Sequence, residues 1–310
     1  MANGSRGRES SGKSGVGVVL ASYGRGALVQ SGEETLRCAL KGRKQRIVCG
    51  DRVHWVSGES DGGPSIDALE PRRNLLERID ARGRGEPVAS NLDRVAAVVA
   101  CEPLPDWFVV DRYWAGARLK DIEALLIVNK SDIRCDDVAA ELANYRILGL
   151  PCIEVSARTG AGLPALRSAL EGAATLLVGQ SGVGKSSLVN VLVPDAEAQT
   201  AELTREEEGR HTTTTARRYR LPSERSSELQ SAVIDAPGVR DFAPPASLAR
   251  AAERGFVEIH RRAIDCRFSD CRHLEEPQCA VRNAVAEGEI SARRYESYRR
   301  LYRLYEKLAC

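Results

Sequence analysis

Short runs of alternating apolar and polar residues fill positions 15–70, and turn residues separate them. Runs of this kind predict β-strands, here at 16–21, 26–30, 34–40, 46–50, 51–56 and 65–69. So many short strands in so short a stretch predict a small closed β-barrel. An OB-type barrel is the expected kind, and an SH3-like barrel is the alternative that the pattern leaves open.

A different pattern starts near residue 91, where the apolar runs become continuous. The runs at 92–100, 123–128 and 151–155, and those before Gly179 and Asp235, predict strands buried on both faces. Stretches at 111–120, 136–148 and 163–171 lie between them and are predicted helices. Strands that alternate with helices predict a doubly wound α/β domain over 91–248, with its site at the C-terminal ends of the strands.

The remaining segments are more polar. Residues 1–14 are predicted to be a disordered tail, and the Arg- and Gly-rich stretch 71–90 is predicted to be a linker. Residues 249–310 form a third, mostly helical region, with a basic, tyrosine-bearing helix expected at 287–308. We therefore expect a multidomain protein with the barrel at 15–70, the α/β domain at 91–248 and a C-terminal domain at 249–310.

Composition narrows the class of protein. An apolar fraction of 43% and a charged fraction of 28% are ordinary for soluble globular proteins. No apolar run approaches the roughly 20 residues of a membrane span, and the N-terminal tail lacks the apolar core of a secretory signal. We expect a cytoplasmic protein with no membrane partner. Nine cysteines, an odd number, argue against a disulfide framework.

The net charge of +2 says little about partners, but the basic residues are unevenly distributed. Two clusters would suit a nucleic-acid backbone, although a solvated protein face explains either cluster equally well. They comprise Arg37, Lys41, Arg43, Lys44, Arg46 and Arg52 in the barrel region, and Arg293, Arg294, Arg299, Arg300, Arg303 and Lys307 near the C-terminus. Tyr23 and Trp55 could stack on bases, although such residues more often serve in packing.

A glycine-rich turn joins the strand ending at Val178 to an apolar helix, and it fits the P-loop pattern of Gly, four residues, Gly, Lys and Ser. Its glycines let the backbone bend around a phosphate, and the N–H groups at the helix start can bind the oxygens. Lys185 is expected to reach the β- and γ-phosphates in a catalytic role, and Ser186 to bind Mg²⁺. The predicted nucleotide ligands are Gly179, Gln180, Ser181, Gly182, Val183, Gly184, Lys185, Ser186 and Ser187.

An Asn-Lys-Ser-Asp tetrapeptide after a buried strand matches the base-reading loop of GTPases. The Asp132 carboxylate can accept hydrogen bonds from guanine N1–H and the exocyclic amine, a pair of donors that adenine does not present. Asn129 can tie this loop to the P-loop, and a Ser-Ala loop downstream can meet guanine O6. The predicted base-binding residues are Asn129, Lys130, Ser131, Asp132, Ser156 and Ala157. GTP and GDP are therefore the expected ligands.

Two further segments carry groups expected around Mg²⁺ and the γ-phosphate. In the polar segment 209–215, either Thr213 or Thr214 is expected to bind Mg²⁺, and the sequence does not distinguish them. Asp235 ends a strand and is expected in the Mg²⁺ shell. The Gly238 N–H is expected to bind the γ-phosphate.

Val239 stands where many GTPases place a glutamine that orients the attacking water. A valine cannot do this, so we expect slow intrinsic turnover. His211 is a candidate for the missing catalytic group, and a histidine with no catalytic part is the equal alternative.

The order of the motifs is unusual, because the base loop and the Ser-Ala loop precede the P-loop. Ordinary GTPases have the reverse order, so the domain is predicted to be circularly permuted. The segment after Asp235 then leads directly into the C-terminal region. A γ-phosphate-dependent movement would have a short path to that region.

Three cysteines and a histidine lie close together near the C-terminus: Cys266, Cys271, His273 and Cys279. Three thiolates and one imidazole make a closed tetrahedral site for one structural Zn²⁺ ion. His260 is a competing ligand, and free cysteines near an unrelated histidine are the alternative. A metal would supply stability that this small, polar region lacks.

This combination of barrel, permuted GTPase and Cys/His module resembles the RsgA family of ribosome small subunit-dependent GTPases. The matching stretches are 50–53, 71–74, 129–132, 179–187, 209–214, 235–242 and 266–281. The resemblance implies a bacterial cytoplasmic factor that binds the small ribosomal subunit late in its maturation. It also implies GTP hydrolysis stimulated by the subunit, release afterwards, and rRNA contacts from the barrel and the zinc module.

Three functions are weighed against one another. An rRNA-binding GTPase of small-subunit assembly, expected to be a monomer, fits the guanine loop and Val239. An ATP-using P-loop enzyme is opposed by Asp132. A non-catalytic nucleic-acid-binding protein that holds GTP as a structural ligand would show no turnover even with the subunit present.

Overall fold

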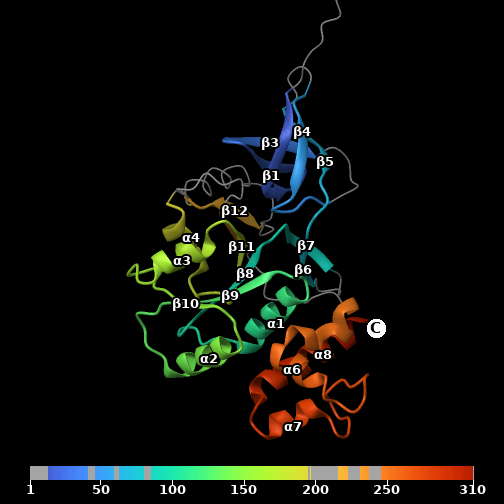
Figure 1. The fold of residues 1–310 in the computed structure, drawn as a ribbon. Coiled ribbons are helices and arrows are strands. Elements are labelled where there is room, and N and C mark those ends of the chain that lie inside the picture. The colour runs from blue at the N-terminus through green and yellow to red at the C-terminus, as the bar shows by residue number, and fades with distance from the viewer. Residues whose placement is uncertain are drawn as a thin grey trace, which may run out of the picture.

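The computed structural model of the chain describes residues 13–40, 46–58, 63–79, 85–194, 196, 216–222, 231–236 and 246–309. Figure 1 shows a barrel at the top, a sheet with helices on both faces in the middle, and C-terminal helices beside α1. In these described stretches, no helix is long and apolar enough to cross a membrane.

The N-terminal barrel is built from strands β1 (Ser14–Tyr23), β2 (Gly26–Ser31), β3 (Glu34–Leu40), β4 (Arg52–Val56) and β5 (Ser65–Leu69). It closes in the order β1-β2-β3-β5-β4, with a parallel β3–β5 pair and antiparallel neighbours elsewhere. This closure confirms the predicted OB-type barrel and decides against the SH3-like alternative.

Two details of the barrel differ from or refine the sequence expectation. The stretch 46–50 is not a strand of the barrel, and only Cys49 forms an isolated bridge, to Ala89. Trp55 belongs to the barrel core, and its indole N–H donates to Ser31 Oγ at 3.1 Å. Because the ring is buried in packing, its interpretation as a base-stacking residue is wrong.

The stretch predicted as a linker carries a two-stranded sheet of β6 (Leu75–Ile79) and β7 (Gly85–Ser90). Leu76 and Ala89 are fully buried in the core of the α/β domain, which the polar composition of the stretch conceals. The hairpin therefore packs as part of the fold.

Asp51 joins the barrel to this hairpin. Its fully buried carboxylate accepts hydrogen bonds from Arg72, from the Ser90 hydroxyl at 2.6 Å and from the Val48 N–H at 2.8 Å. Gly50 has φ 89°, and a Cβ there would lie 2.2 Å from the Ser90 carbonyl oxygen. The close approach of the two backbones requires glycine at this position.

The central sheet contains, within the described residues, β8 (Arg94–Ala100), β9 (Glu123–Asn129), β10 (Cys152–Glu154), β11 (Ala174–Val178), β12 (Arg217–Arg220) and β13 (Ala232–Asp235). Its order is β10-β9-β8-β11-β13-β12, and all neighbours are parallel except the antiparallel β12–β13 pair at the edge. The predicted α/β domain is confirmed, and its mostly parallel strands align their C-terminal ends along one edge.

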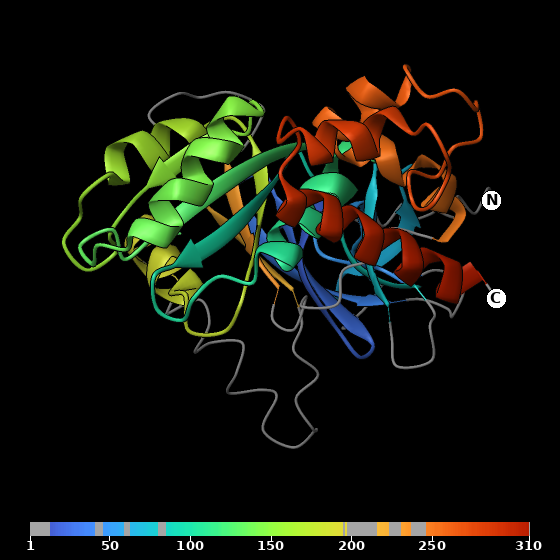
Figure 2. The ribbon, with the colours of Figure 1, turned by 90° about the horizontal axis from the view of Figure 1, so that it is seen from below.

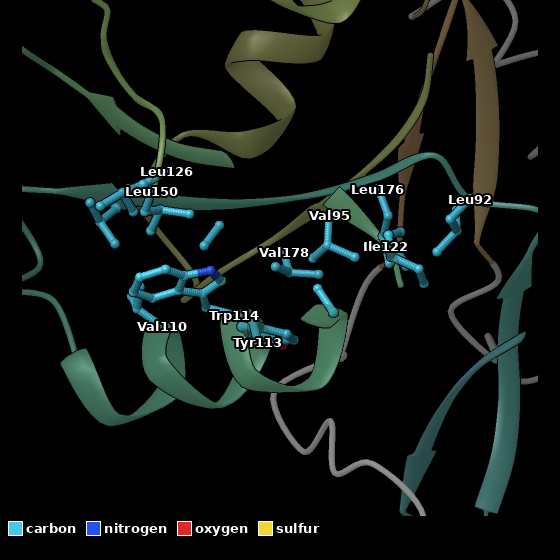
Figure 3. Packing of buried hydrophobic residues seen from close by; sticks show 14 of the residues in the cluster. Leu92, Val95, Val110, Tyr113, Trp114, Ile122, Leu126, Leu150, Leu176 and Val178 are labelled. Atoms are coloured by element: carbon cyan, nitrogen blue, oxygen red, sulfur yellow. The ribbon is translucent and has the colours of Figure 1, made fainter. Parts of the chain in front are cut away.

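Helices cover both faces of this sheet, which explains the continuous apolar runs of its strands. On β8, Val95 and Val99 pack toward α1 (Trp107–Arg118) and α2 (Asp136–Ile147), while Ala96 and Val98 face the opposite core. Helices α3 (Leu163–Leu170) and α4 (Lys185–Leu192) cover that second core. Figure 3 shows the α1 side, with Tyr113 and Trp114 beneath the strands.

Helix α1 begins four residues before the predicted start at 111, because the sequence expectation missed its cap. The Asp106 carboxylate accepts a hydrogen bond from the Phe108 N–H at 3.1 Å. An aspartate at this position satisfies a backbone donor that the helix itself leaves unpaired.

The C-terminal region consists of η2 (Ala246–Gly255), α6 (Val257–Ala263), α7 (Ala280–Ala286) and α8 (Ala292–Ala309). The helix expected at 287–308 therefore begins later, at Ala292. Figures 1 and 2 both place these helices beside α1. Ala115 of α1 belongs to their core, so the C-terminal region packs directly on the α/β domain.

Part of the C-terminal basic cluster faces inward. Arg294 is 1% exposed and donates to the buried Asp111 carboxylate at 2.6 Å and to Glu258 at 2.6 Å. Arg293 donates to the other Asp111 oxygen at 2.7 Å. The assignment of these two arginines to a nucleic-acid backbone is wrong, because internal carboxylates already hold them. Arg300, Arg303 and Lys307 are exposed.

Candidate functional site

The predicted nucleotide motifs follow parallel strands and meet at one edge of the sheet. The base loop follows β9, the Ser-Ala loop follows β10 and the P-loop follows β11, while Asp235 ends β13. In doubly wound sheets this edge is where ligands bind.

The P-loop bends at glycines that no other residue could replace without collision. Gly179 has φ 143°, and a Cβ there would lie 2.3 Å from the Val98 carbonyl oxygen. Gly184 has φ 91°, and its Cβ would lie 2.3 Å from Asn129 Nδ2. The loop therefore runs flush against β8 on one side and the base loop on the other.

Lys185 is the first residue of α4, and its ammonium points back over the P-loop. It donates to the Gly179 carbonyl at 2.9 Å and to the Gln180 carbonyl at 2.8 Å. The exposed residues here are Ser181, Gly182, Ser186 and Ser187, while Val183 is fully buried in the core below them. This arrangement puts a cation, helix N–H groups and a hydroxyl around one turn, as an anion site requires.

Asn129 connects the three loops. Its side-chain amide donates to the Val183 carbonyl at 2.9 Å, and its oxygen accepts the Ala157 N–H at 3.1 Å. The following loop is held to the residue after β10 by the Ser131 N–H, which donates to the Val155 carbonyl at 3.0 Å. Because Asn129 is buried, these bonds tie the base loop firmly to the P-loop and the Ser-Ala loop.

Asp132 lies at the end of the base loop with both oxygens in use. The Ser156 hydroxyl donates to Oδ1, and Arg158 donates to Oδ2 at 2.6 and 3.1 Å. The Ser156 hydrogen bond, followed by that of Arg158, lowers the pKa of Asp132 below its usual value. The carboxylate is therefore kept ionised. Sequence reasoning missed Arg158, although it directly follows the Ser-Ala loop.

The connection between β8 and α1 also lines this edge, which the sequence did not indicate. Lys130, with φ 60°, donates to the Glu102 carbonyl at 2.7 Å. The Gln180 side-chain oxygen accepts the Asp106 N–H at 3.1 Å. The base loop thus holds the connection at Glu102, and the P-loop holds its end at Asp106, which caps α1. A capping aspartate before an apolar helix was the signal that could have located this contact.

Asp235 is half-buried at the end of β13. Burial raises the pKa of its carboxyl, and the charges of Lys185 and Arg217 partly offset that rise. Two cations beside one acid place Asp235 in the same charged cluster as the P-loop lysine.

Other predicted groups lie outside the described residues. These are His211, Thr213, Thr214, Gly238 and Val239. Their roles stay predictions.

A second cluster lies in the C-terminal region. The ligand atoms of Cys266, Cys271, His273 and Cys279 lie within 4.8 Å of one another. His273 Nδ1 is 3.5 Å from the sulfurs of Cys266 and Cys279, and those sulfurs are 3.9 Å apart. Tetrahedral Zn²⁺ with bonds of about 2.3 Å to sulfur separates its sulfurs by about 3.8 Å, so the donor set fits this ion. The competing candidate, His260, is not in this group.

Comparisons with known proteins agree with this architecture. A model of the RsgA GTPase family matches residues 69–244. The small ribosomal subunit biogenesis GTPase RsgA of Azotobacter vinelandii is 42% identical over 295 residues, covering 92% of this chain and 84% of the relative. The protein of that name from Chromohalobacter salexigens is 39% identical over 295 residues, covering 92% and 85%.

Two solved structures share the fold. YjeQ from Thermotoga maritima superposes with a TM-score of 0.71 at 27% identity, covering 94% of this chain and 99% of that one. YloQ, described as a circularly permuted GTPase, has a TM-score of 0.67 at 22% identity, covering 98% of both chains. With a family model over more than half of its length and relatives near 40% identity over most of it, the chain belongs to the RsgA GTPase family and is a GTP-hydrolysing enzyme.

Proposed function

We propose that this GTPase acts late in the maturation of the small ribosomal subunit, binds the subunit and its rRNA, and hydrolyses GTP to GDP and phosphate faster on the subunit. The names of its relatives support the subunit as the partner. The OB-type barrel supports RNA binding, because this fold commonly binds oligonucleotides. We expect it to act as a cytoplasmic monomer.

The observation that carries the choice of GTP is the junction at Asn129. One buried side chain hydrogen-bonds the P-loop carbonyl of Val183 and the N–H of Ala157. These two bonds support the proposal that the P-loop holds the phosphates while the Asn129 and Ser-Ala loops read the base beside it. Asp132, kept ionised by its neighbours, is the proposed acceptor for guanine N1–H and the exocyclic amine.

The residues around the P-loop suit phosphoryl transfer. Lys185 is proposed to neutralise charge on the β- and γ-phosphates, and Ser186 and Asp235 to hold Mg²⁺, with Thr213 or Thr214 as a further ligand. The Gly238 N–H is the proposed γ-phosphate contact. Mg²⁺ supplies charge neutralisation to the bound nucleotide.

The subunit is proposed to control GTP turnover by completing a site in which this chain has no glutamine to orient the attacking water. Val239 has no polar group with which to orient water, and His211 is the chain's own candidate. Slow turnover away from the subunit would keep GTP intact until the complex forms. In this proposal, binding completes the site and hydrolysis then releases the protein.

The Cys/His cluster is proposed to hold one structural Zn²⁺ ion. Its four donors are all supplied by the protein, which leaves no open position for catalysis. The ion would brace the loop between α6 and α7, and through it the C-terminal region that is proposed to contact rRNA.

Turnover of GTP and ATP with and without purified small subunits tests the proposal. We expect slow GTP hydrolysis alone, a rise of several orders of magnitude with subunits, and no ATP hydrolysis. Lys185→Ala is the control and should abolish turnover in both conditions, because it removes the phosphate-facing cation.

Three other results would each contradict a different part of the proposal. GTP turnover indifferent to the subunit would contradict the partner. Equal use of ATP and GTP would contradict the role of Asp132. No turnover with the subunit present would favour a protein that uses GTP only as a structural ligand.

A further inference from the structure

The histidine of the metal cluster has a different partner on each ring nitrogen. His273 is 1% exposed, and its Nδ1 faces the sulfurs of Cys266 and Cys279 at 3.5 Å. Its Nε2 lies 2.8 Å from Glu253 Oε2, on a different element. A carboxylate acceptor sets the proton on Nε2, which leaves the lone pair of Nδ1 directed at the sulfurs.

The backbone around His273 is held separately from its ring. His273 itself has φ 59°, an uncommon conformation for a residue with a side chain. Tyr295 of α8 donates to the His273 carbonyl at 2.6 Å, and Tyr298 donates to the Arg272 carbonyl at 2.7 Å. Helix α8 therefore fixes the main chain, and the Tyr298 ring also lies beside the imidazole, with the ring centroids 6.1 Å apart. Among the described residues, the hydrogen-bond partner of the ring beyond the cysteines is Glu253 on η2.

We propose that Glu253 is a positioning residue for the metal site, which fixes the tautomer and orientation of His273 so that Nδ1 binds the ion. The inference rests on the proposed Zn²⁺ site. Carboxylates that accept from the far nitrogen of a metal-bound histidine raise its basicity and hold its plane. Glu253 lies outside the 266–279 segment, so the Cys/His spacing in the sequence gave no sign of it.

This contact also fastens the metal loop to the nucleotide domain. Glu253 lies two residues before Gly255, the last residue of η2. Gly255 packs closely against α1, because a Cβ there would lie 2.6 Å from Ala115 Cβ. Helix α1 in turn starts at the contact with Gln180 of the P-loop. The Glu253 side chain thus connects His273, the proposed metal ligand, to η2, which packs on α1 of the GTPase domain.

A second histidine shares the same carboxylate. His260 Nδ1 lies 3.3 Å from Glu253 Oε1, but its side chain is 48% exposed and it is outside the metal cluster. Removing it leaves the Glu253–His273 contact in place. His260→Ala therefore separates the effect of Glu253 on the metal from its effect on α6.

Competition with a chromophoric chelator measures the Zn²⁺ affinity of the full-length protein and its variants. Glu253→Ala should lower the affinity by about 10- to 100-fold, the usual effect of losing such a partner. Glu253→Gln keeps an acceptor but loses the charge, so it should fall between Glu253→Ala and the wild type. Glu275→Ala, which removes an exposed carboxylate from the metal loop itself, and His260→Ala should both match the wild type.

The absorption of Co²⁺ bound in place of Zn²⁺ gives a readout that general destabilisation does not move. A reoriented imidazole should change the Co²⁺ bands in Glu253→Ala and not in Glu275→Ala. Should Glu253→Ala fail to fold, Glu253→Gln carries the same comparison.

Two negative results are distinguishable. If the wild type binds no Zn²⁺, the metal site itself is wrong. If the wild type binds tightly and the Glu253 variants bind as tightly as Glu275→Ala with unchanged Co²⁺ bands, the metal site stands and the role of Glu253 is overturned.

Discussion

At the scale of single residues, the nucleotide site depends on backbone conformations that admit no side chain. Gly184→Ala would strain a residue with φ 91° and push a methyl group to 2.3 Å from Asn129 Nδ2. Strain of about 1–2 kcal/mol would then add to the loss of Asn129 hydrogen bonds worth about 1 kcal/mol each. We expect GDP affinity, measured by titration of a fluorescent analogue, to fall more than 100-fold.

Gly182→Ala is the matched control for that substitution. Its φ is 83°, so it carries similar strain in the same loop, but among the described residues its Cβ would meet only Pro103, at 3.6 Å from Cδ, an ordinary van der Waals contact. Its loss of affinity should be clearly smaller. Equal losses in the two variants would show that strain alone matters and that the contact with Asn129 does not.

The charge of Asp132 leads to a prediction about pH. Hydrogen bonds from Ser156 and Arg158 lower the pKa of this carboxyl, so it should stay ionised as pH falls through the usual aspartate range. GDP affinity should therefore hold until the solution is more acidic than that range. Arg158→Gln removes a charged donor and raises the pKa, so its affinity should begin to fall at higher pH than in the wild type.

The measurement is GDP affinity from about pH 7 to about pH 2.5, a range that extends below the usual aspartate pKa of about 3.9. Arg134→Gln is the control, because Arg134 is 94% exposed and pairs with Asp136 instead. Titration of the GDP phosphates affects all variants alike and cancels in the comparison. Identical profiles for Arg158→Gln and Arg134→Gln would refute the electrostatic role of Arg158.

At the scale of elements, α1 and α8 are joined through a buried charge cluster. Asp111 accepts hydrogen bonds from Arg293, Arg294 and Tyr145, and both Asp111 and Arg294 are almost fully buried. The Arg294 guanidinium also lies 4.6 Å from the centroid of the Trp114 ring. Removing one partner leaves the other charge buried, and this costs more than the pair contributes net.

Asp111→Ala should therefore lower the free energy of unfolding by about 3–5 kcal/mol. Urea denaturation followed by tryptophan fluorescence measures it, with Trp114 as a reporter beside the cluster. Glu296→Gln breaks partly exposed pairs on α8 with Arg299 and Arg300 and should cost under about 1 kcal/mol. Similar costs for the two variants would mean that the buried cluster does not hold the helices together.

At the scale of the whole molecule, the C-terminal region has its own small core and is proposed to need a metal. Chelation of Zn²⁺ should increase amide hydrogen exchange across α6, α7 and the loop between them, because metal binding contributes folding free energy there. Exchange in β8, β9 and β11 should stay slow, since their core is separate. Mass spectrometry of exchanged peptides makes the comparison, and uniform exchange changes would contradict a local role for the metal.

Residue-level chemistry was largely predictable where a motif is contiguous. The P-loop, the Asn-Lys-Ser-Asp loop and the cluster of three cysteines and a histidine each lie within one short segment, so their spacing indicates their chemistry. Arg158 and Glu253 were missed for the opposite reason. Each acts on a residue at least 20 positions away, and neither occupies a motif position.

Helices and strands were predictable where burial imposes a regular spacing of apolar residues, and their ends were less predictable. The buried strands of the sheet and the helices between them followed from apolar runs. The start of α1 depended on a cap at Asp106, and the hairpin β6–β7 depended on just a few buried apolar side chains in a polar stretch. The basic residues of α8 led to a wrong prediction for Arg293 and Arg294, because charge alone does not show which way a side chain points.

The amino-acid sequence alone determined the fold class, the order of the motifs and the family. The periodicity of apolar residues and the contiguous phosphate and base loops can be recognised without knowing which distant residues are in contact. The OB closure through β3 and β5, the inward turn of Arg293 and Arg294 and the second bond of Asn129, which accepts the Ala157 N–H, came only from tertiary packing. In each, residues far apart in the chain pair in a buried place, where an unpaired polar group is too costly to leave.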